Sequence, residues 1–172
     1  MAPHLPPRVK PGRHPAPPGV HWRDAGAHDT EFRRDLHHLT HPLAAVLPAG
    51  PDLTALLDLQ YAARTHGYQQ RHPGARALIV ETASAAGRAA GYLLVDDTPT
   101  GLVLVDFAVH PAHQRQGLGA AALARLQEWA GSRSITLSVT PGSPAEHLYL
   151  RAGFTLQGGS ATHHTLRWTP AG

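Results

Sequence analysis

The stretch from residue 102 to residue 123, LVLVDFAVHPAHQRQGLGAAAL, restricts the fold more than any other part of the chain. Residues 102–109 are apolar except for Asp106, and such a strand is typical of the middle of a sheet that is covered on both faces. Pro111 ends this strand, and Gly117 and Gly119 precede a run of helix-forming residues. The stretch therefore predicts a buried central strand, a glycine-containing turn and a helix that begins at the turn.

The rest of the hydrophobic pattern switches between helical and strand periods. Helices are predicted over residues 29–42, where Phe32, Leu36 and Leu39 recur at helical spacing, and over residues 51–74. Further helices are expected at residues 117–133 and 143–154, and strands at residues 19–25, 75–83, 89–97, 102–109, 134–140 and 161–169, with a hairpin turn at 84–88. This order predicts an α/β (α+β) domain with helices on both faces of one sheet.

Length and composition predict one folded domain with a short tail. The 172 residues fit a single domain, which we place at residues 19–170. Residues 1–18 are rich in proline and predict a flexible tail. The chain has no cysteine, which agrees with a reducing cytoplasm, and we see neither a signal peptide nor a membrane span. We therefore expect a cytoplasmic protein with no membrane partner.

Charge and histidine content argue against two other classes of function. The basic residues are scattered and form no stripe with aromatic residues between them, so a nucleic-acid partner is disfavoured. A rival hypothesis, that the basic tail binds nucleic acid, would show itself as steeply salt-dependent binding. His37 and His41 have the spacing of two metal ligands on a helix, but no carboxylate or cysteine completes a set, so no metal is predicted.

The glycine turn has the features of an anion site. The first N–H groups of a helix lack partners inside the helix and carry the positive end of its dipole. Gly117 and Gly119 have no Cβ atom to keep an anion away from the backbone, and Arg115 adds a full charge. The glycine spacing matches neither the dinucleotide fingerprint nor the P-loop. The turn therefore predicts a cradle for a phosphate or pyrophosphate of another kind.

Three sequence blocks together resemble the GNAT N-acetyltransferase superfamily. Residues 114–119, QRQGLG, match its acetyl-CoA pyrophosphate motif Q/R-x-x-G-x-G/A, and they follow the strand end Val109-His110-Pro111. Residues 143–154, SPAEHLYLRAGF, are similar to its N-x-A-x-x-L-Y-x-x-x-G-F block. Residues 59–81 resemble a bacterial subgroup of unknown substrate. The resemblance covers residues 20–168 and implies the GNAT fold, with a mixed, mostly antiparallel sheet of six or seven strands.

The resemblance also implies which residues bind acetyl-CoA. Main-chain groups of Phe107, Ala108 and Val109 would bind the pantetheine arm, in a gap where the fourth and fifth strands splay apart. Ser143 stands where the family usually has an asparagine that helps to hold the cofactor arm, so this contact differs here. The pyrophosphate would lie on the turn formed by Gln114, Arg115, Gln116, Gly117, Leu118, Gly119 and Ala120.

Two residues are candidates for proton transfer. The resemblance assigns to Tyr149 the protonation of the departing CoA thiolate, and a phenol with a pKa near 10 holds its proton at neutral pH. Asp106 is the first candidate for the general base, because a carboxylate inside an apolar strand needs a partner, a raised pKa or a use. Structural hydrogen bonding and substrate binding are equally open for Asp106. By strict alternation it shares a face with Leu104 and Ala108, and a β-bulge would change this parity.

Three other residues are weaker candidates for the base. His110 lies at the strand end and has a suitable ordinary pKa. The other two weaker candidates are Glu81 and Glu146.

The sequence therefore predicts an acetyl-CoA-dependent N-acetyltransferase that moves an acetyl group to a primary amine by direct attack. The alternative is a catalytically inactive CoA-binding sensor or scaffold. The resemblance implies that the acceptor, a small molecule or a peptide, contacts residues 29–73 and 155–168. The basic balance favours a neutral or acidic acceptor over a polyamine. The oligomeric state, including a homodimer, stays open. Candidate acceptor contacts are Tyr61, His66, Tyr68 and Tyr149.

Overall fold

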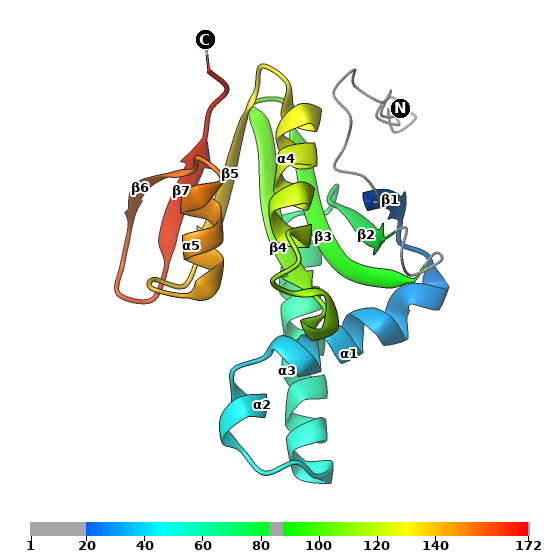
Figure 1. The fold of residues 1–172 in the computed structure, drawn as a ribbon. Helices are drawn as coiled ribbons and strands as arrows, with labels where there is room; N and C mark the ends of the chain where they lie inside the picture. Colours follow the sequence, from blue (N-terminus) through cyan, green and yellow to red (C-terminus); the bar gives the residue numbers. More distant parts are fainter. Residues whose placement is uncertain (1–19, 83–87, 172) are drawn as a thin grey trace.

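The computed structural model describes residues 20–82 and 88–171, which form one open sheet with helices on both faces (Figure 1). Seven strands follow the order β1-β2-β3-β4-β5-β7-β6, and all neighbours are antiparallel except β4 and β5. The predicted sheet is confirmed. The tail and most of the 84–88 turn lie outside the described residues. The strands are β1 Val20–Asp24, β2 Arg76–Thr82, β3 Ala89–Thr98, β4 Gly101–Val109, β5 Ser134–Val139, β6 Thr155–Gly159 and β7 His164–Trp168.

The helices follow the predicted segments with one break. The helix predicted over residues 29–42 ends at Thr40, because His41 precedes Pro42 and takes an extended backbone, which a residue before proline prefers. A short separate helix follows. The long helix begins at Pro51, whose missing N–H costs nothing in a first turn. The helices are α1 Thr30–Thr40, α2 Leu43–Val46, α3 Pro51–Arg71, α4 Leu118–Ala130 and α5 Pro144–Arg151.

Alternate residues of the central strands build two apolar layers. On β2, Leu78 and Val80 face the layer that contains α4, whereas Ile79 faces the layer that contains α1. In the second layer Leu36 of α1 is 2% exposed. Leu39, which the helical spacing had placed on the same face, is 53% exposed, so this part of the predicted stripe is wrong. The chain turns away at Pro42, and Leu39 lies just before that exit.

β4 opens a gap in the middle of the sheet. It pairs with β5 only from Gly101 to Leu104, so the pair separates beyond that point. On its other edge β4 stays paired with β3, with a register shift that leaves Val105 as an extra residue. This β-bulge pairs Asp106 with Leu94, so Asp106 lies on the α1 side of the sheet. Strict alternation would have placed Asp106 on the same side as Leu104.

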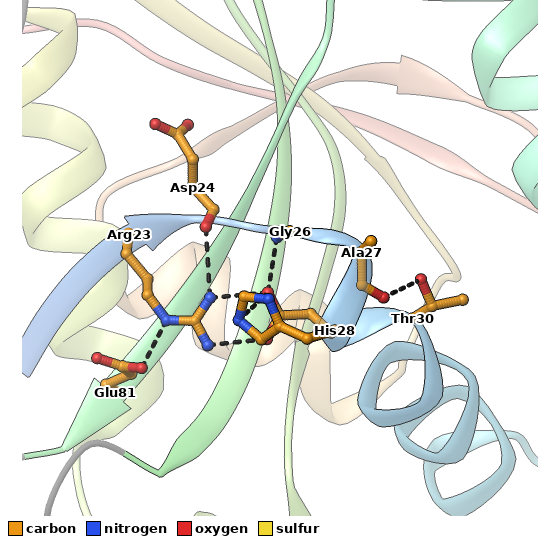
Figure 2. A network of polar contacts seen from close by, with 8 residues as sticks. Arg23, Asp24, Gly26, Ala27, His28, Thr30 and Glu81 are labelled. Atoms are coloured by element: carbon orange, nitrogen blue, oxygen red, sulfur yellow. Dashed lines mark hydrogen bonds and ion pairs between the residues drawn. The ribbon is translucent and has the colours of Figure 1, made fainter.

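A partly buried ion-pair network joins the first two strands to the start of α1 (Figure 2). Arg23 of β1 donates to Asp29 at 2.7 and 2.8 Å and to Glu81 of β2 at 2.6 Å. The carboxylate of Asp29 also accepts the Gly26 N–H at 2.7 Å. The hydrogen bonds from Arg23 lower the pKa of Asp29 to about 2, although burial opposes them. The network fixes the start of α1 against the edge of the sheet.

Asp29→Asn is expected to lower the free energy of unfolding by about 2 kcal/mol at pH 7. The depressed pKa means that this stabilisation is present above the ordinary pKa of an aspartate and is lost as the pH falls toward about 2. Urea titrations of both proteins across this range should therefore converge at low pH. Asp35→Asn is the matched control, because Asp35 is exposed and should change stability by less than about 0.5 kcal/mol. A pH-independent difference would contradict this assignment.

Candidate active site

A cavity of about 1210 Å³ extends from the glycine turn, along the gap beside β4, to helices α1 and α3. The predicted site residues that line it come from three elements, β4, α4 and α5, and from two turns. Gln116 and Leu118 do not line it: Gln116 donates its side-chain N–H to the Ala112 carbonyl, and Leu118 is a core residue, 6% exposed. The predicted residues in its wall are Asp106, Phe107, Ala108, Val109, Gln114, Arg115, Gly117, Gly119, Ala120, Ser143 and Tyr149.

The glycine turn points backbone groups into one end of this cavity. Arg115 has a φ of 59° and Gly117, which caps α4, has a φ of 78°, so the chain takes left-handed conformations on both sides of Gln116. Such conformations direct successive N–H groups to one side, as in anion-binding nests. Gly117 has open space where a Cβ would lie. At Gly119 a Cβ would lie 2.9 Å from Leu148, so close packing of α4 on α5 is a second reason for this glycine.

The edge of β4 that faces the gap carries main-chain groups without a partner strand. His110 donates its N–H to Ala90 of β3, so the main-chain groups of Val109 point to the other edge, where β5 has already separated. The carbonyl of Val109 accepts the side-chain N–H of Gln114 at 3.0 Å. The N–H of Phe107 donates to the carboxylate of Asp106 at 2.9 Å. This edge is thus arranged like an edge strand inside a cavity.

Ser143 precedes α5, and Tyr149 lies within it. Ser143 caps the helix, and its Oγ accepts the N–H of Glu146 at 3.2 Å. Tyr149 is 6% exposed, and its ring lies 5.7 Å from that of Phe154. Burial, followed by the charge of Asp106, raises the pKa of Tyr149 above its ordinary value. The phenol therefore keeps its proton at neutral pH and presents it to the cavity.

Asp106 is held by a residue that the sequence did not single out. Arg64 of α3 donates to its Oδ1 at 2.5 Å. The Arg64 side chain also donates to the hydroxyl of Tyr68 at 2.7 Å. Burial raises the pKa of Asp106, and Arg64 offsets part of this rise. A carboxylate with a raised pKa is a better proton acceptor than an exposed one, so the geometry suits a base.

The other candidates for the base have different uses and do not line the cavity. His110 caps the short helical turn at Pro111–His113, with its Nδ1 accepting the Ala112 N–H at 3.1 Å. Glu81 is paired with Arg23. Glu146 accepts the Gly142 N–H at 2.6 Å and contacts His164 of β7 at 2.5 Å. Of these candidates Asp106 alone opens into the cavity.

Sequence reasoning missed the cationic side chains at the far end of the cavity, Arg33 and Arg64. A signal was present for Arg64, because it lies at helical spacing between Tyr61 and Tyr68, and all three line the cavity. A lone carboxylate in an apolar strand also requires a cation nearby. His66, which we had grouped with these tyrosines, is exposed and is not part of the wall.

The charges of the wall fit a polyanion. Among the residues that the structure describes, its charged side chains are four arginines and a single aspartate, Asp106. Arg115 lies in the glycine turn, Arg151 ends α5, and Arg33 and Arg64 line the end with α1 and α3. Open nest backbone, an unpaired strand edge and arginines are together what coenzyme A, with its phosphates and its peptide-like arm, would require.

Two features are absent from the described residues, a metal-ligand cluster and a helix that could cross a membrane. No group of three or more histidine, cysteine or acidic side chains is placed to hold a metal ion in residues 20–82 and 88–171. Across the same ranges, no helix has the length and apolar character that a membrane crossing needs.

Comparison with known proteins identifies the family. The family model of the acetyltransferase (GNAT) family matches residues 36–154. The chain therefore belongs to the GNAT family, whose members are acyltransferases. A comparison with curated protein sequences finds no match.

Solved structures share the fold over nearly their whole length. The PaiA N-acetyltransferase of Thermoplasma acidophilum, solved in complex with coenzyme A, has a TM-score of 0.67 at 11% identity, over 88% of this chain and 99% of that one. An acetyltransferase of Thermus thermophilus has a TM-score of 0.62 at 19% identity, with coverages of 88% and 97%. The spermidine/spermine N-acetyltransferase SpeG of Vibrio cholerae, solved with manganese ions, has a TM-score of 0.58 at 17% identity, with coverages of 88% and 92%. At these identities the likeness shows the fold alone.

Proposed function

We propose that the protein is an acetyl-CoA-dependent N-acetyltransferase that acts on a primary amine. The observation that carries the proposal is one continuous cavity in which the open edge of β4, the glycine turn, Tyr149 and Asp106 all meet. Membership of the GNAT family supports the same activity.

The residues have separate binding roles in this proposal. Backbone N–H groups from Gln114 to Ala120 hold the pyrophosphate, with Arg115 beside them. The free edge of Phe107 and Val109 pairs with the pantetheine arm as one strand pairs with another. Ser143 serves chiefly as the cap of α5. Coenzyme A, when bound, supplies the acetyl group as an activated thioester.

Two residues move the protons. Asp106 takes a proton from the ammonium of the acceptor, directly or through water, and the free amine attacks the acetyl carbonyl. A C–N bond forms, the C–S bond breaks, and the sulfur leaves with the electron pair of that bond. Tyr149 gives its proton to this sulfur, and the attacking nitrogen releases its second proton to solvent as the amide forms. Solvent then returns a proton to Tyr149 and takes one from Asp106, so each turnover releases one proton and the cycle closes without a metal ion or a covalent enzyme intermediate.

Titration calorimetry and a transfer assay together test this function. We expect acetyl-CoA to bind the full chain with micromolar affinity. Mass spectrometry of reactions with a panel of amines should then detect acetylated products together with free CoA thiol. Binding without transfer to any amine would instead support the sensor or scaffold alternative. No binding to the folded protein would contradict both hypotheses.

Asp106→Asn should lower kcat by about a hundredfold, because a positioned base contributes at least that much. In the wild type we expect the rate to fall as the pH drops through the raised pKa of Asp106, where the base becomes protonated. This acidic limb of the pH–rate profile should be absent from the asparagine variant. In Arg64→Gln the limb should move to higher pH, because Arg64 holds the pKa down. An unchanged limb in Asp106→Asn would assign the base to another group.

A further inference from the structure

The part of α1 that lines the cavity carries two buried hydrogen-bond donors without an acceptor. His37 is 8% exposed, and its Nε2 has no hydrogen-bond partner among residues 20–82 and 88–171. The Nε of Arg33, one turn earlier on the same helix, is also buried without a partner in these ranges. Both side chains belong to the wall of the cavity. A buried donor that stays unpaired destabilises the folded protein by about 1–3 kcal/mol. A ligand that accepts hydrogen bonds from both donors would therefore gain binding free energy.

The contact between His37 and Arg64 shows which ring nitrogen carries the proton. The Arg64 guanidinium lies 3.5 Å from Nδ1 of His37. A guanidinium only donates, so Nδ1 must accept, and the neutral imidazole then has its hydrogen on Nε2. Burial, together with the charge of Arg64, lowers the pKa of His37 to about 4, so the ring is neutral at physiological pH. Nε2–H is therefore a fixed donor.

Arg33 is held in place by the aromatic ring of β3. Its guanidinium donates to the hydroxyl of Tyr92 at 3.1 Å and lies 4.7 Å from the centre of that ring. These contacts leave the Nε–H free. Arg33 thus offers a positioned donor together with a full positive charge.

The charges at this end of the cavity select against a second cation. Arg33 and Arg64 face a single carboxylate, Asp106, so this end carries net positive charge. An acceptor that places an ammonium at Asp106 brings the rest of its structure toward two arginines. A polyamine would meet like charges there, whereas an anion would meet two positive charges and two unused donors.

We propose that the acceptor is a small amine that also carries a carboxylate, which is bound by the Nε–H of Arg33 and the Nε2–H of His37 while the amine lies at Asp106. The proposal rests on the proposed acetyl transfer and names its substrate class. Arg64 contacts both Asp106 and His37, so the two ends of the acceptor lie on either side of one guanidinium. This arrangement favours short amino acids over long chains.

Matched pairs of ligands test the carboxylate separately from turnover. N-acetylglycine and N-acetylglycinamide differ only at the carboxylate, and both are product-like, so their binding requires no acetyl transfer. Calorimetry with the full chain should show the acid binding at least about tenfold more tightly, as one charge-assisted hydrogen bond would give. In NMR spectra of the wild type, the acid and not the amide should shift the Nε2–H signal of His37. Equal affinities would overturn the proposal.

Variants locate the effect at α1. His37→Leu removes the donor and should reduce the acid-to-amide affinity ratio toward one, whereas His37→Gln keeps an N–H donor and should retain part of it. His66→Leu is the matched control, since this exposed histidine on α3 lies outside the cavity. Arg33→Gln removes the other donor together with its positive charge, and it provides a second test if His37→Leu does not fold. A ratio that is unchanged in both Arg33→Gln and the folded His37 variants would also overturn the proposal.

Transfer assays separate failure of the substrate class from failure of the proposed function. Glycine, β-alanine and γ-aminobutyrate should be acetylated more efficiently than glycinamide, methylamine or spermidine. Efficient transfer to spermidine or to the neutral amines would refute the proposal that the acceptor carries a carboxylate. The proposed acetyltransferase activity would still stand. Absence of transfer to every amine would refute the proposed function, and the binding pair above would still decide whether α1 holds a carboxylate.

Discussion

Tyr149→Phe is expected to lower kcat by about 10³-fold while acetyl-CoA affinity changes little. The substitution removes only the hydroxyl, and the ring keeps its packing against Phe154. A thiolate is a basic leaving group, so without a proton donor the C–S bond breaks more slowly. The raised pKa ensures that Tyr149 holds this proton across the neutral range. Steady-state kinetics, with calorimetry for the affinity, measure both quantities.

A second hydroxyl in the cavity provides the control for Tyr149. Tyr61 of α3 lines the end of the cavity with α1 and α3, with its ring 5.5 Å from that of His37. Tyr61→Phe should therefore act mainly on KM for the amine, with a small effect on kcat. If Tyr149→Phe lowered kcat by less than about tenfold, water would be the proton donor and Tyr149 an aromatic core residue.

Gly117→Glu is expected to weaken acetyl-CoA binding by about 10²–10³-fold. The φ of 78° costs a non-glycine residue about 1–2 kcal/mol, and the new carboxylate would repel the pyrophosphate at the start of α4. Titration calorimetry measures the loss directly. Because both the active enzyme and the sensor alternative need CoA, this result would not depend on turnover.

Gly131→Glu controls for backbone strain and charge. Gly131 has a φ of 60° with open space around it, and it ends the same helix that Gly117 begins. Its substitution should lower stability in a thermal melt and leave acetyl-CoA affinity close to that of the wild type. Equal loss of binding in both variants would mean that strain in α4, and not contact at the turn, explains the result at Gly117.

Most of the fold could be predicted because its signals are local. The apolar run at residues 102–109 is central, and α4 begins at Gly117 and ends at Gly131 as its glycines indicate. The strand Thr155–Gly159 escaped notice because all its residues are exposed and two are glycines, so it has no apolar period. The predicted burial of Leu39 was wrong, because helical spacing shows only which residues share a face of the helix. It does not show which part of that face the neighbouring elements cover.

By itself the sequence predicted most of the residues that line the end of the cavity with the glycine turn, since this turn, its arginine and the strand before it are contiguous in the chain. The opposite end was decided by the tertiary structure. The bulge at Val105 turned Asp106 toward the helices, where it meets Arg64 across 42 positions of sequence. Packing of α1 and α3 over the sheet then buried His37 and left its Nε2 without a partner. Burial and pairing depend on which elements meet in space, and no local pattern of residues encodes that.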